Sequence, residues 1–200
     1  MSAISTIEAL EALYGTPGEA SLIKVADRLT PLYAEWIGRA RFCILSTVGP
    51  EGTDASPRGD DGPVVTMDGP RRLLLPDWRG NNRIDSLRNI VRDPRVSLMF
   101  MVPGSANVIR VNGRGAVSAE EGLLARFERD GARPRTVIVI EVGEVYSQCA
   151  RAILRARLWA GEDESAGLPS VGDLLTEAKR GFDGAAYDRE WPERARGSMW

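Results

Sequence analysis

Short apolar runs broken by turn residues dominate the middle of the chain. Their composition predicts β-strands, which cover 41–48, 53–59, 64–67, 72–75, 96–102, 108–117 and 136–145. Because most of these strands follow one another without a helix between them, the pattern favours antiparallel hairpins over a doubly wound parallel sheet. Closure protects the edges of an antiparallel sheet, so we expect a small barrel. Gly113 and Gly115 predict either a β-bulge or a strongly coiled strand.

Apolar residues at helical spacing lie mainly towards the two ends of the chain. Two capping boxes, Ser5-x-x-Glu8 and Ser118-x-x-Glu121, predict helix starts. Further helices are predicted from Ser21, from Pro31, from about Asn82 to Asp93, over 148–159 and over 170–180. The last twenty residues show no clear periodicity. We therefore expect one domain, with a helical segment (1–40) packed on a barrel core (41–160) and a C-terminal helix and tail (161–200).

The composition excludes several kinds of site. The chain has 200 residues, no histidine and a net charge of -2. Without histidine, His-based catalytic triads and the usual zinc sites cannot form, so no metal site is expected. The nearly balanced charge gives no reason to expect nucleic acid as a partner. Cys43 and Cys149 lie among apolar neighbours without CxxC spacing, which predicts two buried thiols.

No apolar run is long enough to cross a membrane, and the N-terminus lacks a basic segment followed by an apolar one. A cytoplasmic protein is therefore expected. Among the cations only Lys24 and Lys179 are lysines. Arginine binds planar and phosphate anions bidentately, although a base-composition bias of the genome is the simpler explanation of the overall excess.

The stretch 76–90 contains the most distinctive polar cluster. An apolar run ends at Pro76, and apolar residues then return at helical spacing from Ile84. The turn between them contains Asp77, Trp78, Arg79, Gly80, Asn81, Asn82 and Arg83. Cationic and amide side chains at a helix N-terminus suit an anion, above all a phosphate. The alternative is a plain turn, with an asparagine as helix cap and the arginines in solvent.

Two other stretches have candidate chemistry. In Ser56-Pro57-Arg58-Gly59 an arginine is held between proline and glycine at a strand end. In the predicted helix 148–159, Gln148, Arg151 and Arg155 share one face. Each stretch has an ordinary alternative, a solvent-facing loop for the first and a solvated basic face for the second. Neither a dinucleotide loop nor a P-loop nor a nucleophile elbow is present.

The order of these stretches resembles the pyridoxamine 5'-phosphate oxidase-like FMN-binding split barrels, and more narrowly their probable FMN-dependent enzymes. The resemblance covers about residues 5 to 180. It depends on Ser56-Pro57-Arg58-Gly59, Leu73-Leu74-Leu75-Pro76-Asp77, Gly80-Asn81-Asn82-Arg83, Ser86-Leu87-Arg88-Asn89-Ile90, Arg110-Val111-Asn112-Gly113, and Tyr146-Ser147-Gln148-Cys149-Ala150-Arg151-Ala152 with Leu158-Trp159.

The resemblance implies a mainly β protein with peripheral helices, built on a six-stranded antiparallel split β-barrel. It implies a homodimer with FMN in a cleft between the subunits. The phosphate would be held by Arg58 with Gly59, Arg79, Asn81, Asn82 and Arg83. Ser56 and Asp77 would lie beside the ribityl chain or the flavin ring, and the other subunit would contribute Gln148, Arg151, Arg155 and Trp159.

The expected function is FMN-dependent oxidoreduction of an unknown small-molecule substrate, with an electron donor such as NAD(P)H. Pyridoxamine 5'-phosphate oxidases carry an Arg-x-His element near the C-terminus, whereas this chain has only the loose echo Trp191-Pro192-Glu193-Arg194. Vitamin B6 oxidation is therefore not expected. Two alternatives remain, a flavin-binding or ligand-sequestering protein without turnover, and a barrel that holds heme or a deazaflavin. No catalytic acid or base stands out.

Overall fold

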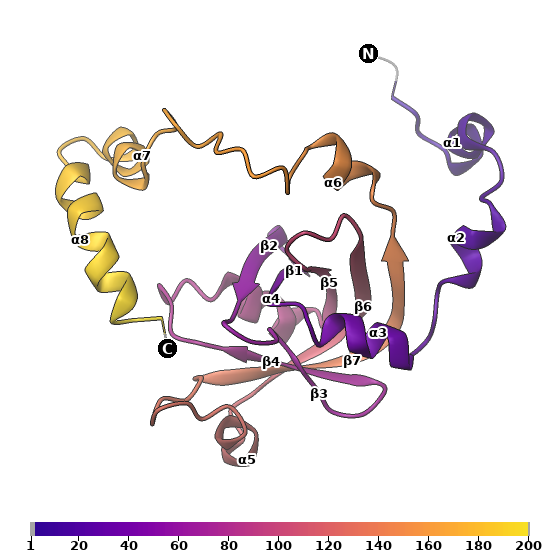
Figure 1. The fold of residues 1–200 in the computed structure, drawn as a ribbon, viewed down its shortest axis with the longest axis horizontal. Coiled ribbons are helices and arrows are strands. Elements are labelled where there is room, and N and C mark those ends of the chain that lie inside the picture. Colours follow the sequence, from indigo (N-terminus) through magenta and orange to yellow (C-terminus); the bar gives the residue numbers. More distant parts are fainter. Residues whose placement is uncertain (1–2, 200) are drawn as a thin grey trace.

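The computed structural model describes residues 3–199, and its centre is one antiparallel β-sheet (Figure 1). The strands are β1 (Phe42–Gly49), β2 (Gly52–Gly59), β3 (Thr66–Met67), β4 (Arg72–Asp77), β5 (Arg95–Met101), β6 (Val108–Ser118) and β7 (Thr136–Gln148). They lie side by side in the order β2-β1-β5-β6-β7-β4-β3. The predicted mainly β architecture with antiparallel neighbours is confirmed.

The prediction of six strands is wrong, because the sheet contains seven. The strand predicted over 64–67 is the short β3, whose two residues, Thr66 and Met67, pair with Leu74 and Leu73 of β4. Over residues 3–199 the sheet is not closed, since β2 and β3 form its two edges. The predicted bulge is confirmed, because the register between β6 and β7 shifts between Asn112 and Gly113.

The core lies on one face of the curved sheet. In β1 the side chains of Cys43, Leu45 and Thr47 are buried, while the residues between them are partly exposed, as the period of two requires. The apolar run of β4 differs, because its residues from Leu73 to Pro76 are all buried. The chain leaves the core only at Asp77, so β4 delivers the following turn directly to the edge of the sheet.

Helices cover parts of this core. They are α1 (Ile7–Tyr14), α2 (Glu19–Ile23), α3 (Pro31–Ile37), α4 (Asp85–Arg92), α5 (Glu121–Ala125), α6 (Arg151–Arg155), α7 (Val171–Ala178) and α8 (Gly184–Arg196). Helix α4 packs against β1, β2 and β6 and buries Ser86 and Ile90. Helix α3 buries Ile37 fully. Figure 1 shows α7 and α8 on one side of the sheet and α1 and α2 on the other.

The sequence misplaced several helical features. Ser118 does not cap α5, whose N-cap is Glu120 without a side-chain hydrogen bond. The predicted helix 148–159 is only α6, because β7 continues to Gln148. The thirteen-residue α8 was missed, since Pro192 lies inside it and its apolar periodicity is weak. Cys149 is exposed, so only Cys43 is the buried thiol that was predicted.

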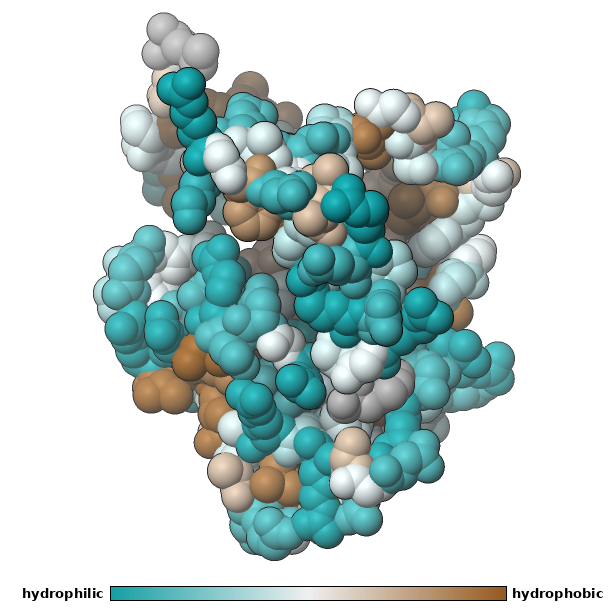
Figure 2. All heavy atoms as spheres, turned by 90° about the vertical axis from the view of Figure 1, so that its left-hand side faces the viewer, coloured by the Kyte–Doolittle hydropathy of each residue, from teal (hydrophilic) through white to brown (hydrophobic). Residues whose placement is uncertain are grey.

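Many large apolar side chains of the outer helices are exposed. In α1 they include Ile7, Leu13 and Tyr14, and none of the residues of α1 or α2 is buried. Figure 2 shows hydrophobic patches separated by a largely hydrophilic surface on one face of the molecule. None of the helices within residues 3–199 is both long and apolar enough to span a membrane. How the chain divides into segments 1–40, 41–160 and 161–200 stays a prediction.

Candidate functional site

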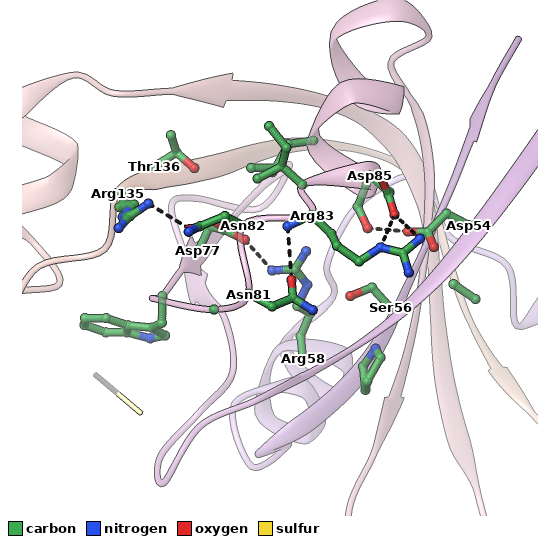
Figure 3. A pocket seen from close by; sticks show the side chains of 17 residues that line it. Asp54, Ser56, Arg58, Asp77, Asn81, Asn82, Arg83, Asp85, Arg135 and Thr136 are labelled. Atoms are coloured by element: carbon green, nitrogen blue, oxygen red, sulfur yellow. Dashed lines mark hydrogen bonds and ion pairs between the residues drawn. The ribbon is translucent and has the colours of Figure 1, made fainter. Parts of the chain in front are cut away.

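A cavity of about 680 Å³ lies where β2, the end of β4, the start of α4 and the start of β7 meet. Its volume is in the range typical of small-molecule and cofactor sites. Six of the predicted site residues line it: Ser56, Arg58, Asp77, Asn81, Asn82 and Arg83. The structure therefore brings together two stretches that are separated in the sequence by a hairpin (Figure 3).

Arg58 of β2 crosses to the end of β4, where its guanidinium donates a hydrogen bond to the carboxylate of Asp77. Both side chains are less than one-fifth exposed. The Nε atom of Arg58 is buried and has no hydrogen-bond partner within residues 3–199. A buried donor without a partner costs about 1–3 kcal/mol, so this atom marks a place where an acceptor would be stabilising.

The turn after β4 has an unusual backbone. Asn82 and Ile84 both have positive φ, at 63° and 53°. This conformation is strained for a β-branched residue such as Ile84, and such strain costs about 1–3 kcal/mol. Two hydrogen bonds hold the turn: Asn81 Oδ1 accepts from the Arg83 N–H at 3.0 Å, and Asn82 Oδ1 accepts from Arg135 Nη1 at 2.9 Å. Strain retained at a cavity is typical of functional sites.

Helix α4 begins in the cavity wall. Its N-cap residue Ile84 provides no side-chain hydrogen bond to the first turn, whose N–H groups point towards the helix N-terminus. Asp85 lies in that turn and accepts a hydrogen bond from Arg83 Nε at 2.9 Å, while Ser86 donates one to Asp54. The carboxylate of Asp85 thus lies near the positive end of the helix dipole, where negative charge is stabilised.

The charges of the cavity are balanced. Three arginines, Arg58, Arg83 and Arg135, face three aspartates, Asp54, Asp77 and Asp85. The Arg83 side chain is 78% exposed, so it can leave Asp85 for an incoming anion at little cost in packing. The hydroxyl of Thr136 is buried without a hydrogen-bond partner among the described residues. The cavity thus offers cationic donors from three arginines and one unsatisfied hydroxyl.

The other predicted site residues lie elsewhere. Gly59 and Arg79 line a second cavity beyond Arg58. Gln148 lies at the end of β7, where it accepts a hydrogen bond from Arg110 Nη1 at 3.3 Å. The prediction that it shares a helix face with Arg151 and Arg155 is therefore wrong. Arg151 and Arg155 lie on α6, and Trp159, which follows α6, donates to the Ser105 carbonyl at 2.8 Å. None of these four lines the first cavity.

Asp54, Ser86, Arg135 and Thr136 line the first cavity and were missed by the sequence. Thr136 reaches the site because it pairs with Asp77 in the antiparallel register of β4 and β7. That register depends on the tertiary fold, so no local pattern indicates it. Asp54 carried a weak signal, since it lies two residues before Ser56 and so on the same face of β2.

The fold and the cavity together define a mainly β protein with a polar site at the edge of its sheet. The family model for pyridoxamine 5'-phosphate oxidase matches residues 29–149, which is more than half of the chain. The chain therefore belongs to the pyridoxamine 5'-phosphate oxidase family of split barrels. No curated protein sequence matches it significantly.

Several solved structures are similar to the chain at low sequence identity. A variant of HupZ from Group A Streptococcus is 14% identical, with a TM-score of 0.50, and the match covers 60% of this chain and 99% of that chain. A protein assigned to pyridoxamine 5'-phosphate oxidase from Lactobacillus delbrueckii is 18% identical, with a TM-score of 0.48, covering 60% and 95%. General stress protein 26 from Bacillus anthracis is 18% identical, with a TM-score of 0.40, covering 54% and 84%.

Proposed function

We propose that the chain binds FMN in the first cavity and acts as an FMN-dependent oxidoreductase on a small molecule. One observation supports this most: Arg58, Arg83 and the uncapped start of α4 converge on one cavity, together with the unpaired Arg58 Nε. Convergent arginine donors and helix N–H groups are the chemistry that holds a phosphate. Family membership agrees with a flavin but does not by itself require one.

The residues of the cavity fit the parts of FMN. Arg83, Asn81 and the first turn of α4 would hold the phosphate, and the guanidinium of Arg58 would donate to it. The hydroxyls of Ser56 and Thr136 suit the ribityl chain, because each can donate and accept. Asp77 keeps Arg58 in place and accepts hydrogen bonds.

The flavin and the protein would have different roles. A bound flavin supplies hydride and electron transfer, and the protein supplies binding, orientation and electrostatics. Arg58 is held at one position by Asp77, so its positive charge is directed without loss of side-chain freedom at binding. Such fixed positive charge favours an anionic form of the ligand, and this is the role that we assign to the chain's own residues.

The flavin ring would extend beyond a single chain. Gln148, Arg151, Arg155 and Trp159 lie outside the cavity of their own chain. We include in the proposal a homodimer in which the partner copy brings these side chains to the ring. The exposed apolar side chains Leu154 and Leu158 next to them, at 63% and 48% exposure, favour contact with another surface.

The test compares FMN with riboflavin, which lacks the 5'-phosphate. We expect saturable binding of FMN, measured by quenching of flavin fluorescence, and at least tenfold weaker binding of riboflavin. Equal affinity for the two would contradict the phosphate site, and no binding of FMN would overturn the proposed function.

Turnover is tested on the FMN-loaded protein. Anaerobic addition of NADH or NADPH should bleach the flavin absorbance, and a small-molecule acceptor should restore it. Bound FMN that no reductant or acceptor changes would favour the alternative of a flavin-binding protein without turnover. Heme is the weaker alternative, because the sequence has no histidine and leaves only Cys, Met or Tyr as axial ligands of the iron.

A further inference from the structure

A second cavity, of about 560 Å³, lies directly beyond the first. Four residues line both cavities: Pro57, Arg58, Trp78 and Gly80. The two cavities therefore share one wall. Its walls are more apolar than polar in residue type, with Val64 and Leu75 from the core and Met199 from the end of the described chain.

The acidic groups of the second cavity are already paired. Asp60, whose side chain is only 5% exposed, accepts hydrogen bonds from Arg129 at 3.0 Å and from Trp78 Nε1 at 3.2 Å. Asp61 pairs with the same Arg129 at 2.6 Å. Arg58 is likewise paired with Asp77. Because these charged side chains already form ion pairs with one another, they offer a ligand little uncompensated charge.

Arg79 differs from its neighbours. It lines the second cavity, and within residues 3–199 its guanidinium has no salt bridge or side-chain hydrogen bond. A guanidinium presents a planar fork of donors that matches a carboxylate. The cavity thus combines an apolar wall with one cation that has no partner among the described residues.

We propose that the second cavity binds a small monocarboxylate with an apolar body, with its carboxylate on Arg79 and its apolar part against Trp78 and Met199. A phosphate dianion is disfavoured, because the single charge of Arg79 does not balance two negative charges. A cation is disfavoured by Arg79 itself. If FMN fills the first cavity, the monocarboxylate is the reactant beside the flavin. This assignment of a role rests on the proposed function, whereas binding of the monocarboxylate to the second cavity does not.

The test uses two probes that differ in charge, 4-fluorobenzoate and the neutral 4-fluorobenzamide, observed by fluorine NMR with the full chain. We expect the benzoate to bind about tenfold more tightly than the benzamide, because a charge-assisted hydrogen bond is lost with the amide. Inorganic phosphate should not displace it. Equal affinity for the two probes, no binding of the benzoate, or displacement by phosphate would each overturn the proposal.

A matched pair of variants locates the site. Arg79→Gln should weaken benzoate binding about tenfold and leave the benzamide unchanged. Arg180→Gln is the control, since Arg180 is an exposed arginine between α7 and α8 that lines neither cavity. It should bind benzoate like the native chain. Benzoate binding that Arg79→Gln leaves intact would contradict the assignment.

Measurement with and without FMN separates this proposal from the previous one. Benzoate binding that persists in a chain unable to bind FMN supports the second cavity and contradicts the flavin site. FMN binding without benzoate binding supports the flavin site and contradicts the proposal for the second cavity. With both ligands bound, benzoate should perturb the flavin absorption spectrum, because the two cavities adjoin at Arg58, and an unchanged spectrum would contradict their contact.

Discussion

Two arginines of the first cavity show how setting changes the role of a side chain. Arg58 is 19% exposed and fixed by Asp77, whereas Arg83 is 78% exposed and held only by its neighbour Asp85. The first is an organised donor that needs no rearrangement, and the second must exchange partners when an anion binds. Removal of Arg58 also leaves Asp77 without its cation, so it affects the empty site as well.

Arg83→Ala should weaken FMN binding by about 1.5–3 kcal/mol, the range of a charge-assisted contact, and leave riboflavin affinity unchanged. Arg58→Ala should weaken FMN binding at least as much, since its donor is preorganised. Fluorescence titration with both flavins measures this, with Arg180→Ala as the control. If neither variant changes the affinity for FMN, the phosphate does not lie between these arginines.

Asp93, at the end of α4, should make the stability of the chain depend on pH. Its carboxylate accepts hydrogen bonds from the Arg95 side chain and backbone, which hold its pKa at about 2, below its ordinary value of 3.8. A lowered folded-state pKa stabilises the native chain above pH 3.8, and this contribution is lost as the pH falls towards 2.

The stability advantage of the native chain over Asp93→Asn should therefore be larger at about pH 5 than at about pH 2. Urea unfolding at the two pH values measures the free-energy difference between the two proteins. Other lowered carboxyl groups, such as Asp27 and Asp68, contribute equally to both proteins and cancel in the comparison. The same advantage at both pH values would show that Asp93 is not stabilised by Arg95.

At the scale of elements, the bulge between β6 and β7 has a steric cause. A Cβ atom on Gly113 would lie 2.1 Å from the backbone oxygen of Glu141, and neither backbone can move without breaking the ladder. The strands on both sides belong to the centre of the sheet, which includes the start of β7 at Thr136 in the first cavity.

Gly113→Ala should destabilise the chain by about 1–3 kcal/mol, the usual cost of overpacking. Gly62→Ala is the control, because a Cβ atom there meets no heavy atom within 4 Å and its φ is not positive. Chemical unfolding measures both. Equal stability of the two variants would show that the bulge adapts to a side chain.

At the scale of the whole molecule, the distribution of apolar surface is uneven. The sheet buries its run Leu73–Leu75 fully, whereas α1, α2 and α6 bury no residue at all. Exposed leucine, isoleucine and tyrosine side chains on several helices favour association. We proposed above that the partner is a second copy, which would bring α6 to the flavin.

Sedimentation velocity should give twice the mass of one chain. Replacement of Leu154 and Leu158 by Ser should shift the population towards monomer and weaken FMN binding together, because the partner's side chains would leave the ring. Exchange of Leu13 on α1 for Ser is the comparison for a general loss of apolar surface. A monomer with full FMN affinity would contradict the shared site.

The sequence predicted the strands, and half of the predicted site residues line the first cavity. Alternation in β1 and the apolar run of β4 are local patterns, so they indicated where these strands lie. Arg58 and Arg83 were found because proline, glycine and asparagine mark their turns. The N-terminus of α5 was wrong and the helix α8 was missed, since caps and weakly periodic helices depend on packing partners.

The sequence by itself determined which segments form strands, the absence of histidine chemistry, and the cluster of arginines around 76–83. Only the tertiary structure decided which of these arginines share a cavity, because Arg58 meets Asp77 through a fold that pairs distant strands. It also placed Arg79 in the adjoining cavity and brought Arg135 and Thr136 from the start of β7 to the first one. Spacing along a chain fixes faces and turns, whereas strand register fixes which faces meet.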